Sequence, residues 1–221
     1  MSRPPPPSLR PEREAWQAGA TIVAGLDEAG RGPLAGPVVA AAVVIDRAFL
    51  EGAFLDHYAG LTDSKQLTAR RRATFSAALL GDARIRHGLA QASVAEIDQL
   101  NILRATHLAM RRALDALGSC DHVLVDGLPV PGLGRASTAL VGGDGRSYSI
   151  AAASVIAKVA RDAMMDELDR AYPAYGFARH RGYGTAAHLK ALREHGPCPV
   201  HRRSFAPVTQ LLLPIAARGC D

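Results

Sequence analysis

The chain has 221 residues, 48% of them hydrophobic, which is enough to bury one sizeable core. Its most apolar run, Pro37–Ile45, is far shorter than the roughly 20 residues that a membrane-spanning helix needs. The formal charge of +5 is compatible with a polyanionic partner without requiring one, and Cys120, Cys198 and Cys220 have no metal-ligand spacing. An odd number of cysteines fits a reducing compartment, so we expect a soluble, cytoplasmic protein.

The chain begins with a proline-rich segment, MSRPPPPSLRPERE. This segment contains four consecutive prolines and lacks the apolar region that a signal peptide carries. Residues 1–18 are therefore predicted to be a disordered leader.

Two apolar runs follow, Thr21–Leu26 and Pro37–Ile45, and both predict buried β-strands. Asp27 and Glu28 come directly after the first run, and a glycine-rich turn over residues 29–33 separates them from the second. Burying a carboxylate pair costs several kcal/mol unless cations or hydrogen-bond donors compensate. The pair therefore indicates either a metal site or an ordinary solvated turn, and this stretch alone does not decide between them.

The middle of the chain predicts helices and strands that alternate, at residues 68–80, 85–93, 101–117 and 122–125. Thr68 is a suitable N-cap for the first helix, Ser93 and Asn101 are further candidate caps, and Gly118 ends the second helix. The last of these strands stops at Asp126 and is followed by a Pro/Gly-rich loop. A carboxylate thus follows an apolar run for the second time.

A long helix is predicted over Ser149–Ala171, because this segment contains no Gly or Pro. Ser154, Lys158 and Asp162 recur at i, i+4 and i+8 and therefore share one face of it. From the helix alone, an exposed face with an ordinary Lys–Asp pair is the favoured interpretation. The alternative is that Asp162 brings a further carboxylate to a functional site.

The remaining residues predict a small helical C-terminal lobe. Tyr172–Tyr183 has loop composition, Thr185–His195 predicts a short helix, and Val208–Ala217 is a last apolar segment. Arginines and histidines are concentrated between Arg181 and Arg203, which suits contact with a phosphate backbone.

The predicted strands and helices do not alternate regularly enough for a doubly wound sheet. We therefore expect an α/β fold in which helices flank both faces of a mixed β-sheet. The main domain is placed at residues 19–172 and the C-terminal lobe at 173–221.

Four carboxylates meet at one end of this sheet if Asp126 ends a strand beside Asp27 and Glu28 and if Asp162 projects from the covering helix. Their spacing in the sequence does not by itself establish this convergence. Such a cluster would repel itself without divalent cations, and oxygen ligands select Mg²⁺ or Mn²⁺. Two such ions about 4 Å apart are the general machinery of phosphodiester hydrolysis.

The glycine turn also fits a loose dinucleotide-binding pattern, G-x-G-x-x-G/A, at Gly30, Gly32 and Ala35. That pattern requires a helix to begin in the glycine turn. The segment that follows, Pro37–Ile45, has strand composition instead, which argues against dinucleotide binding.

Six motifs stand out along the chain: GLDEAGRGPLAGPVVAAAVV from Gly25, DSK at Asp63–Lys65, VDG at Val125–Gly127, AAASVIAKVARD at Ala151–Asp162, HRGYGT at His180–Thr185 and HRRSF at His201–Phe205. In this order, between about Ile22 and Pro207, they closely resemble ribonuclease HII, the bacterial type 2 ribonuclease H family. The resemblance implies a ribonuclease H-like fold and an endonuclease that cuts the RNA strand of RNA/DNA hybrids. It also implies cleavage on the 5′ side of single ribonucleotides embedded in duplex DNA, which leaves 3′-hydroxyl and 5′-phosphate ends. Such an enzyme removes misincorporated ribonucleotides and RNA primers.

The resemblance also implies roles for individual residues. The family's four metal-binding carboxylates map onto Asp27, Glu28, Asp126 and Asp162, with Mn²⁺ or Mg²⁺ as the cofactor. The turn that reads the ribose 2′-hydroxyl, largely through backbone groups, maps onto Gly30, Arg31 and Gly32. Glycine suits this role because only a residue without Cβ lets the main chain approach a sugar so closely.

Tyr183 matches the family's tyrosine that stacks on the deoxyribose following the ribonucleotide, and its alternative role is that of a half-buried loop aromatic. Candidate phosphate contacts are Ser64, Lys65 and Lys158. Three arginines are expected to hold the duplex or the lobe in place, or to act as structural ion-pair partners: Arg181, Arg202 and Arg203.

Two alternatives concern the function and the tail. A non-catalytic protein that binds RNA/DNA hybrids remains the second hypothesis for function, although the presence of all four acids argues against it. We expect a monomer with no membrane contact. The segment Gln210–Leu213 weakly resembles a sliding-clamp-binding peptide, and a packed amphipathic helix is the favoured interpretation.

Overall fold

The computed structural model describes residues 6–212 of the chain. The strands of this range form one sheet: β1 (Val23–Ala29), β2 (Val38–Ile45), β3 (Ile85–Ala92), β4 (His122–Asp126) and β5 (Ala136–Leu140). Their order is β3-β2-β1-β4-β5. β2 pairs antiparallel with both β1 and β3, whereas β4 pairs parallel with both β1 and β5. The predicted mixed sheet is confirmed.

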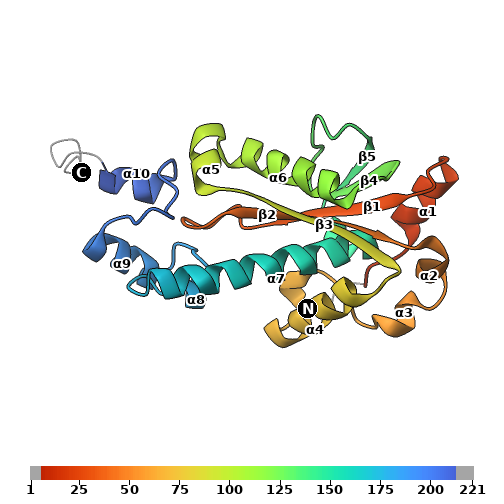
Figure 1. Cartoon of the computed structure of the whole chain (residues 1–221), viewed down its shortest axis with the longest axis horizontal. Helices are drawn as coiled ribbons and strands as arrows, with labels where there is room; N and C mark the ends of the chain where they lie inside the picture. The colour runs from red at the N-terminus through yellow and green to blue at the C-terminus, as the bar shows by residue number, and fades with distance from the viewer. Residues whose placement is uncertain (1–5, 213–221) are drawn as a thin grey trace.

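Helices cover both faces of the sheet (Figure 1). α6 (Ile102–Leu117) packs on β2 and β3, and α7 (Tyr148–Ala171) packs on β1 and β2 from the opposite side. Strand β2 is buried along its whole length because its alternate residues enter two different cores. Val43 lies in the core beneath α7, and Val44 lies in the core beneath α6.

Two glycines allow these helices to approach the sheet closely. A Cβ on Gly25 would lie 2.1 Å from the carbonyl carbon of Ser149 in α7, and a Cβ on Gly88 would lie 2.1 Å from the carbonyl oxygen of Ala113 in α6. Any side chain at either position would push the helix away. Because side chains alternate along a strand, Asp27 shares the α7 face of β1 with Gly25, so the close approach of α7 also determines what surrounds Asp27.

The remaining helices are short, and none of the helices described is long and apolar enough to cross a membrane. The α-helices are α1 (Arg10–Gln17), α2 (Arg47–Glu51), α3 (Phe54–His57), α4 (Ala69–Gly81), α5 (Val94–Leu100), α8 (Phe177–His180), α9 (Ala186–His195) and α10 (Ala206–Leu212). Two 3₁₀ turns, η1 (Ser64–Gln66) and η2 (Gly143–Gly145), flank the functional end of the sheet.

The predicted helix starts are confirmed by their caps. The side chains of Thr68, Ser93 and Asn101 each accept a hydrogen bond from the backbone amide three residues later. Several elements were not predicted, among them α2, α3, β5 and α8, the last of which lies inside a segment of loop composition. Strand β5 has the sequence ASTAL and is mostly exposed, so it lacks the apolar alternation that identifies a strand.

Helices α8, α9 and α10 gather at one end of the molecule, as Figure 1 shows in blue. They share a hydrophobic cluster in which Phe177, Leu192 and Val208 meet Met165 of α7 and Leu34 of the loop after β1. The lobe is therefore joined to the sheet through apolar contacts. The division at residue 172 stays a prediction.

The prediction that residues 1–18 form a disordered leader is wrong for the described part, because residues 10–17 form helix α1. Leu9 and Trp16 are buried, and Glu12 is fully buried. The Oε1 atom of Glu12 accepts hydrogen bonds from the Ser147 hydroxyl at 2.6 Å and from the Ser149 amide at 3.0 Å. Glu12 thus accepts hydrogen bonds from donors at the start of α7 that have no partner within the helix. The polar composition of the segment concealed this single buried contact.

The tail follows its predicted course as far as it is described. Helix α10 buries Val208 in the cluster of the lobe, and Leu211 packs against the same cluster, as a packed amphipathic helix should. The predicted end of this segment at Ala217, and with it Leu213 and Cys220, lies outside the described residues.

The contact between α1 and α7 predicts a stability difference. Glu12→Ala leaves the Ser147 hydroxyl and the Ser149 amide without their buried acceptor, and we expect it to lower the free energy of unfolding by about 2–3 kcal/mol. Glu14→Ala, on the exposed side of the same helix, should change it by less than about 0.5 kcal/mol. Urea denaturation of both variants checks this, and equal losses would show that the buried cap contributes nothing.

Candidate active site

Strand pairing brings two aspartates together. β1 and β4 run parallel, with Leu26 opposite Val125, so the next residues, Asp27 and Asp126, lie side by side toward the carboxyl ends of both strands. Strand β1 continues to Ala29, so Asp27 lies within the strand rather than after it, which corrects the predicted strand end. The predicted convergence of Asp27 with Asp126 is what the fold produces.

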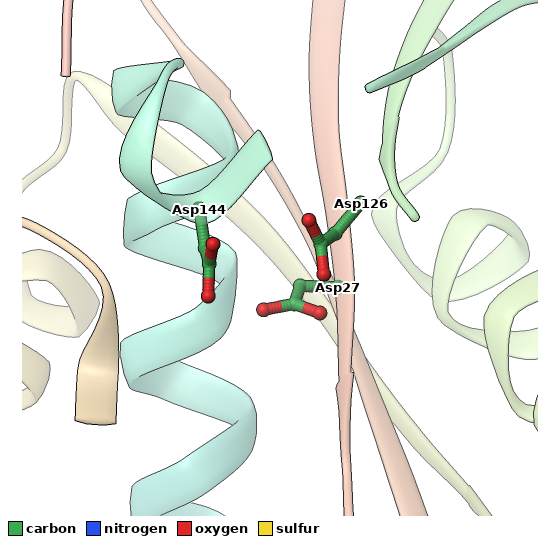
Figure 2. A group of neighbouring side chains, drawn as sticks. All are labelled: Asp27, Asp126 and Asp144. Atoms are coloured by element: carbon green, nitrogen blue, oxygen red, sulfur yellow. The ribbon is translucent and has the colours of Figure 1, made fainter. Parts of the chain in front are cut away.

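A third aspartate, Asp144, completes this group, which we call the acidic cluster: Asp27, Asp126 and Asp144. One carboxylate oxygen from each lies within 4.8 Å of the others, and Figure 2 shows the side chains pointing toward one another. Asp144 reaches the cluster from η2, the turn that precedes α7. The Gly143 amide donates to Asp126 Oδ1 at 2.6 Å, which fixes this turn against the end of β4.

The acidic cluster carries more negative charge than its buried surroundings favour. Asp27 is 4% exposed and Asp144 is 6% exposed. Burial raises the pKa of Asp27 well above its usual range, and the carboxylates of Glu28 and Asp126 raise it further. Burial, together with the charges of Asp126 and Asp63, raises the pKa of Asp144 to about 6. Converging carboxylate oxygens in this environment fit a hard divalent cation such as Mg²⁺ or Mn²⁺.

A cavity of about 250 Å³ opens beside the acidic cluster. It brings together most of the predicted site residues from distant parts of the sequence. Its lining comprises Asp27, Glu28, Ala29, Gly30, Arg31, Gly32, Ser64, Lys65, Ser154, Lys158, Arg161 and Tyr183.

Glu28 reaches this cavity although it follows Asp27 on the same strand. Its Oε1 atom lies 3.3 Å from Arg31 Nη1. Burial raises the pKa of Glu28, and the neighbouring Arg31 opposes that rise. Glu28 therefore lies between the acidic cluster and the glycine turn.

Asp162 does not belong to the acidic cluster. Its Oδ1 atom lies 2.5 Å from Lys158 Nζ and 3.8 Å from Arg181 Nε. The structure therefore contains the i, i+4 pair that the helix alone favoured. The expected exposed face is wrong, because Ser154 is buried and Lys158 and Asp162 are half-buried. Asp144 occupies the place expected for Asp162, and its neighbours Gly142, Gly143 and Gly145 made it look like part of a simple turn. The available signal was an acid in the turn between a strand and the N-cap of α7.

A buried arginine holds the glycine turn from behind. Arg202 is fully buried, and its guanidinium donates five hydrogen bonds of 2.6–3.2 Å to the carbonyl oxygens of Gly30, Arg31, Pro33, Gly36 and Pro37. It therefore fixes the turn and cannot reach a duplex. Of the roles expected for this arginine, the structure favours holding the lobe in place.

Arg161 supports the same turn from α7. It is buried, and it donates to the carbonyl oxygens of Ala35, Pro37 and Arg181 at 3.1–3.2 Å. The other two arginines differ from this pair: Arg181 bonds to Asp166 and to the Asp162 carbonyl, whereas Arg203 is exposed and its amide donates to Asp98.

The two glycines of the turn differ in how much room they leave for a side chain. Gly30 has a φ of +98°, and a Cβ there would lie 1.9 Å from Arg161 Nε. Gly32 has an ordinary backbone conformation, and the atom nearest to a Cβ there is in the Tyr183 ring, at 3.5 Å. Of these two, only Gly30 is required to be glycine by its backbone conformation and its contacts within the protein.

The predicted phosphate contacts differ in accessibility. Ser64 is buried and accepts a hydrogen bond from the Ser154 hydroxyl at 2.9 Å. Lys65 is largely exposed, with its Nζ atom 3.8 Å from Asp144 Oδ2. Lys158 is mostly buried and paired with Asp162. Lys65 is therefore the more accessible of the two lysines near the acidic cluster.

Tyr183 projects from the lobe toward the glycine turn, and the residue is 48% exposed. Its backbone is held by a histidine network in the lobe. The Tyr183 carbonyl lies 2.9 Å from His188 Nδ1, and His188 Nε2 lies 3.0 Å from His201 Nε2. Both histidines are buried. Burial lowers the pKa of His201 to about 4 and also lowers that of His188.

Comparisons with known proteins agree with one another. Residues 24–208 match the family profile described as Ribonuclease HII. The chain is 58% identical to the ribonuclease HII of Paramagnetospirillum magneticum over 87% of its own length and 94% of that protein, and 51% identical to that of Halorhodospira halophila over 92% and 99%. The crystal structure of the ribonuclease H2 from Pyrococcus horikoshii superposes with a TM-score of 0.70 at 27% identity, over 86% of this chain and 97% of that one.

The contrast between the two glycines predicts different costs for the same substitution. Gly30→Ala should lower the free energy of unfolding by about 2 kcal/mol or more, because the new side chain meets Arg161 and the backbone conformation is strained. Gly32→Ala should change it by less than about 1 kcal/mol. Thermal or urea unfolding of the pair checks this, and a Gly32→Ala variant as unstable as Gly30→Ala would contradict it.

The histidine network predicts a pH-dependent stability. Since the pKa of His201 falls from about 6.5 in the unfolded chain to about 4 in the fold, the unfolded state binds more protons between these values. The contribution of His201 to the free energy of unfolding is complete above pH 6.5. It is lost as the pH falls toward 4, by about 1.4 kcal/mol per pH unit. Charged or titratable groups that face His201 are His188, His180, Cys198 and Tyr175.

The measurement is the difference in unfolding free energy between the parent protein and His201→Gln from pH 7 to pH 4.5. Because Asp144 has a raised pKa, it contributes with the opposite sign over part of this range, but it does so in both proteins and cancels in the difference. The advantage of the parent should shrink as the pH falls. A difference that is independent of pH would contradict the assignment.

Proposed function

The chain belongs to the ribonuclease HII family, whose members are metal-dependent endoribonucleases acting on RNA/DNA hybrids, and we propose that it also cuts 5′ of single ribonucleotides embedded in duplex DNA. The products are then 3′-hydroxyl and 5′-phosphate ends. The observation that supports this proposal most strongly is that Asp27 of the acidic cluster, the glycine turn and Tyr183 line one cavity. The biological role follows as removal of misincorporated ribonucleotides and RNA primers.

The acidic cluster and Glu28 are the proposed metal ligands, for two ions of Mg²⁺ or Mn²⁺. These four carboxylates differ from the set predicted from the sequence only in that Asp144 replaces Asp162. Divalent cations bound there supply Lewis acidity for attack by water and for departure of the 3′ oxygen. The protein contributes a buried, prearranged set of oxygens, which its neighbours keep in place before substrate arrives.

The glycine turn is the proposed reader of the ribose. The carbonyls of Gly30 and Arg31 are already bonded to Arg202, so the turn is rigid before substrate binds. Gly32 has no packing reason of its own to lack a side chain, which is consistent with close approach of a sugar. A 2′-hydroxyl at this position distinguishes RNA from DNA.

Tyr183 and the cations beside the cavity complete the substrate site. The Tyr183 ring lies next to Gly32, so a sugar stacked on it would be the neighbour of the ribose held at the turn. We assign this position to the deoxyribose that follows the ribonucleotide. Lys65 is the proposed phosphate contact near the acidic cluster, and Ser64 and Lys158 are further candidates.

The predicted alternative, a hybrid-binding protein without catalysis, has no observation in its favour. Three of the acids that cleavage needs converge, and two of these are buried, an arrangement for which a binding protein has no use. The cytoplasmic location and the monomeric state stay predictions, and a sliding-clamp contact through the tail stays the less favoured interpretation of that segment.

Cleavage of duplex DNA that bears one ribonucleotide, with Mg²⁺ or Mn²⁺ and with mapped product ends, tests the proposal. Asp126→Asn and Asp144→Asn should each lower kcat/KM by ~100-fold or more, because each removes a charged metal ligand. Asp162→Asn should lower it by less than about 10-fold. The matched control is Asp115→Asn, an exposed acid on α6, which should leave it unchanged.

Titration calorimetry of Mn²⁺ with the same variants separates binding from catalysis. The affinity for Mn²⁺ should be the same in the parent protein, Asp162→Asn and Asp115→Asn. It should be weaker in Asp144→Asn. If Asp144→Asn cleaves as well as the parent while Asp162→Asn is inactive, the revised ligand set is wrong. If hybrids bind without any metal-dependent cleavage, the non-catalytic alternative is established.

A further inference from the structure

The histidines of the lobe form a chain of hydrogen bonds that ends at the backbone of Tyr183. The Cys198 amide donates to His201 Nδ1 at 3.0 Å, the two Nε2 atoms of His201 and His188 are 3.0 Å apart, and His188 Nδ1 lies 2.9 Å from the Tyr183 carbonyl. The interior of the lobe and the exposed ring of Tyr183 are thus joined by side chains that no solvent reaches.

Only one arrangement of protons satisfies this chain when both rings are neutral. A carbonyl oxygen accepts only, so His188 Nδ1 carries a hydrogen and donates to Tyr183. His188 Nε2 is then an acceptor, and His201 Nε2 must be the donor. His201 Nδ1 is left as the acceptor that the Cys198 amide requires. Both rings are therefore fixed in orientation and in tautomer.

The residues around the chain keep both rings neutral and in place. His188 and His201 are 0% and 1% exposed, and the ring of Phe177 packs against both. His180 stacks on His188 with 4.4 Å between ring centroids, and its Nδ1 atom accepts a hydrogen bond from the Gly182 amide. The Arg181–Gly182 and Tyr183–Gly184 peptide groups are therefore both anchored by histidines.

The network also reaches the other side of the cavity. His201 directly precedes Arg202, which holds the glycine turn, and the Gly182 carbonyl accepts a hydrogen bond from the Leu34 amide at 2.8 Å. The Tyr183 ring lies within contact of Gly32. The distance between the ring and the turn is thus set by the lobe rather than by either segment alone.

These side chains are not arranged as a metal site. His201 directs its two nitrogens at partners on opposite sides of the ring, so one cation cannot bind both. Among the described residues, the acidic cluster is the one group of three or more potential ligands whose donor atoms converge. The histidines also lie behind the Tyr183 backbone and do not line the cavity, so they have no direct contact with substrate.

We propose that His188 and His201 are positioning residues that hold Tyr183 opposite the glycine turn and thereby set the preference for an RNA–DNA junction over a uniform RNA/DNA hybrid. This inference rests on the proposed function, because it takes Tyr183 as the reader of the junction. It assigns the selectivity of the enzyme partly to buried groups that never touch the nucleic acid.

Two substitutions at one position separate this role from general packing. His188→Asn places an amide near the former Nδ1 and keeps the donor to the Tyr183 carbonyl. His188→Gln extends toward the former Nε2 and keeps only the contact with His201. The measured quantity is the ratio of kcat/KM for a single embedded ribonucleotide to that for a uniform hybrid. His188→Gln should lower this ratio about 10-fold, and His188→Asn should retain most of it.

The same substitution in a Tyr183→Ala background shows whether the effect acts through the tyrosine. There His188→Gln should change the ratio by less than about 2-fold. An unchanged ratio in His188→Gln, equal losses in the Gln and Asn variants, or a loss that persists without the tyrosine ring would each overturn the inference.

A long-range ¹H–¹⁵N spectrum of the histidine side chains of the parent protein at neutral pH provides a test that needs no activity and no variant. It should show His188 as the Nδ1–H tautomer and His201 as the Nε2–H tautomer. The opposite tautomers, or a charged ring at either position, would overturn the inference. If the parent protein cleaves neither substrate, the proposed function is overturned. If the parent protein cleaves both substrates and has the predicted tautomers, but His188→Gln leaves the ratio unchanged, only this inference is overturned.

Discussion

The parallel pairing of β1 with β4 is the constraint on which the functional end of this molecule depends. It forces Asp27 and Asp126 together at the carboxyl ends of two buried strands, and the turn before α7 adds Asp144. Gly25 lets α7 lie directly on β1, so water is largely excluded from Asp27. Three carboxylates with oxygens within 4.8 Å of one another, two of them buried, are unfavourable without compensating positive charge. A fold that keeps them so is arranged to bind a cation.

The glycine turn and Tyr183, which are proposed to contact the substrate, are held by buried side chains from distant parts of the sequence. Arg202 and Arg161 use their guanidinium groups on backbone carbonyls of the turn and the loop that follows it, rather than on carboxylates. A planar guanidinium with five N–H donors suits this task, because it can bond several carbonyls at once in fixed directions. The lobe thereby fixes the glycine turn, and through His188 it also fixes Tyr183. Recognition and catalysis share one rigid frame, which is the condition for preorganised binding.

Sequence patterns were sufficient for the features that local physics controls. Apolar runs located β1, β2 and β4, and capping residues located the starts of α4, α5 and α6. These signals are local, because the spacing of apolar residues and the identity of a cap each depend on only a few neighbouring residues. They failed where a long-range contact decides. Asp144 looks like a turn residue until β5 places it beside β4, and Glu12 looks like an exposed leader residue until α7 places its first turn against it. Asp162 satisfied the helix pattern but is paired with Lys158, and no local pattern distinguishes an acid paired on its own helix from one that reaches a neighbouring strand. The sequence left Arg202 open between holding the duplex and holding the lobe, because burial cannot be read from charge.

The position of a bound cation shows which carboxylates are metal ligands. Crystals of the protein grown with Mn²⁺ allow the ions to be located by anomalous scattering, independently of any assay. The proposed ligand set predicts anomalous peaks in direct contact with carboxylate oxygens of Asp27, Asp126 and Asp144. Peaks that lie against Asp162 and leave Asp144 without contact would contradict it.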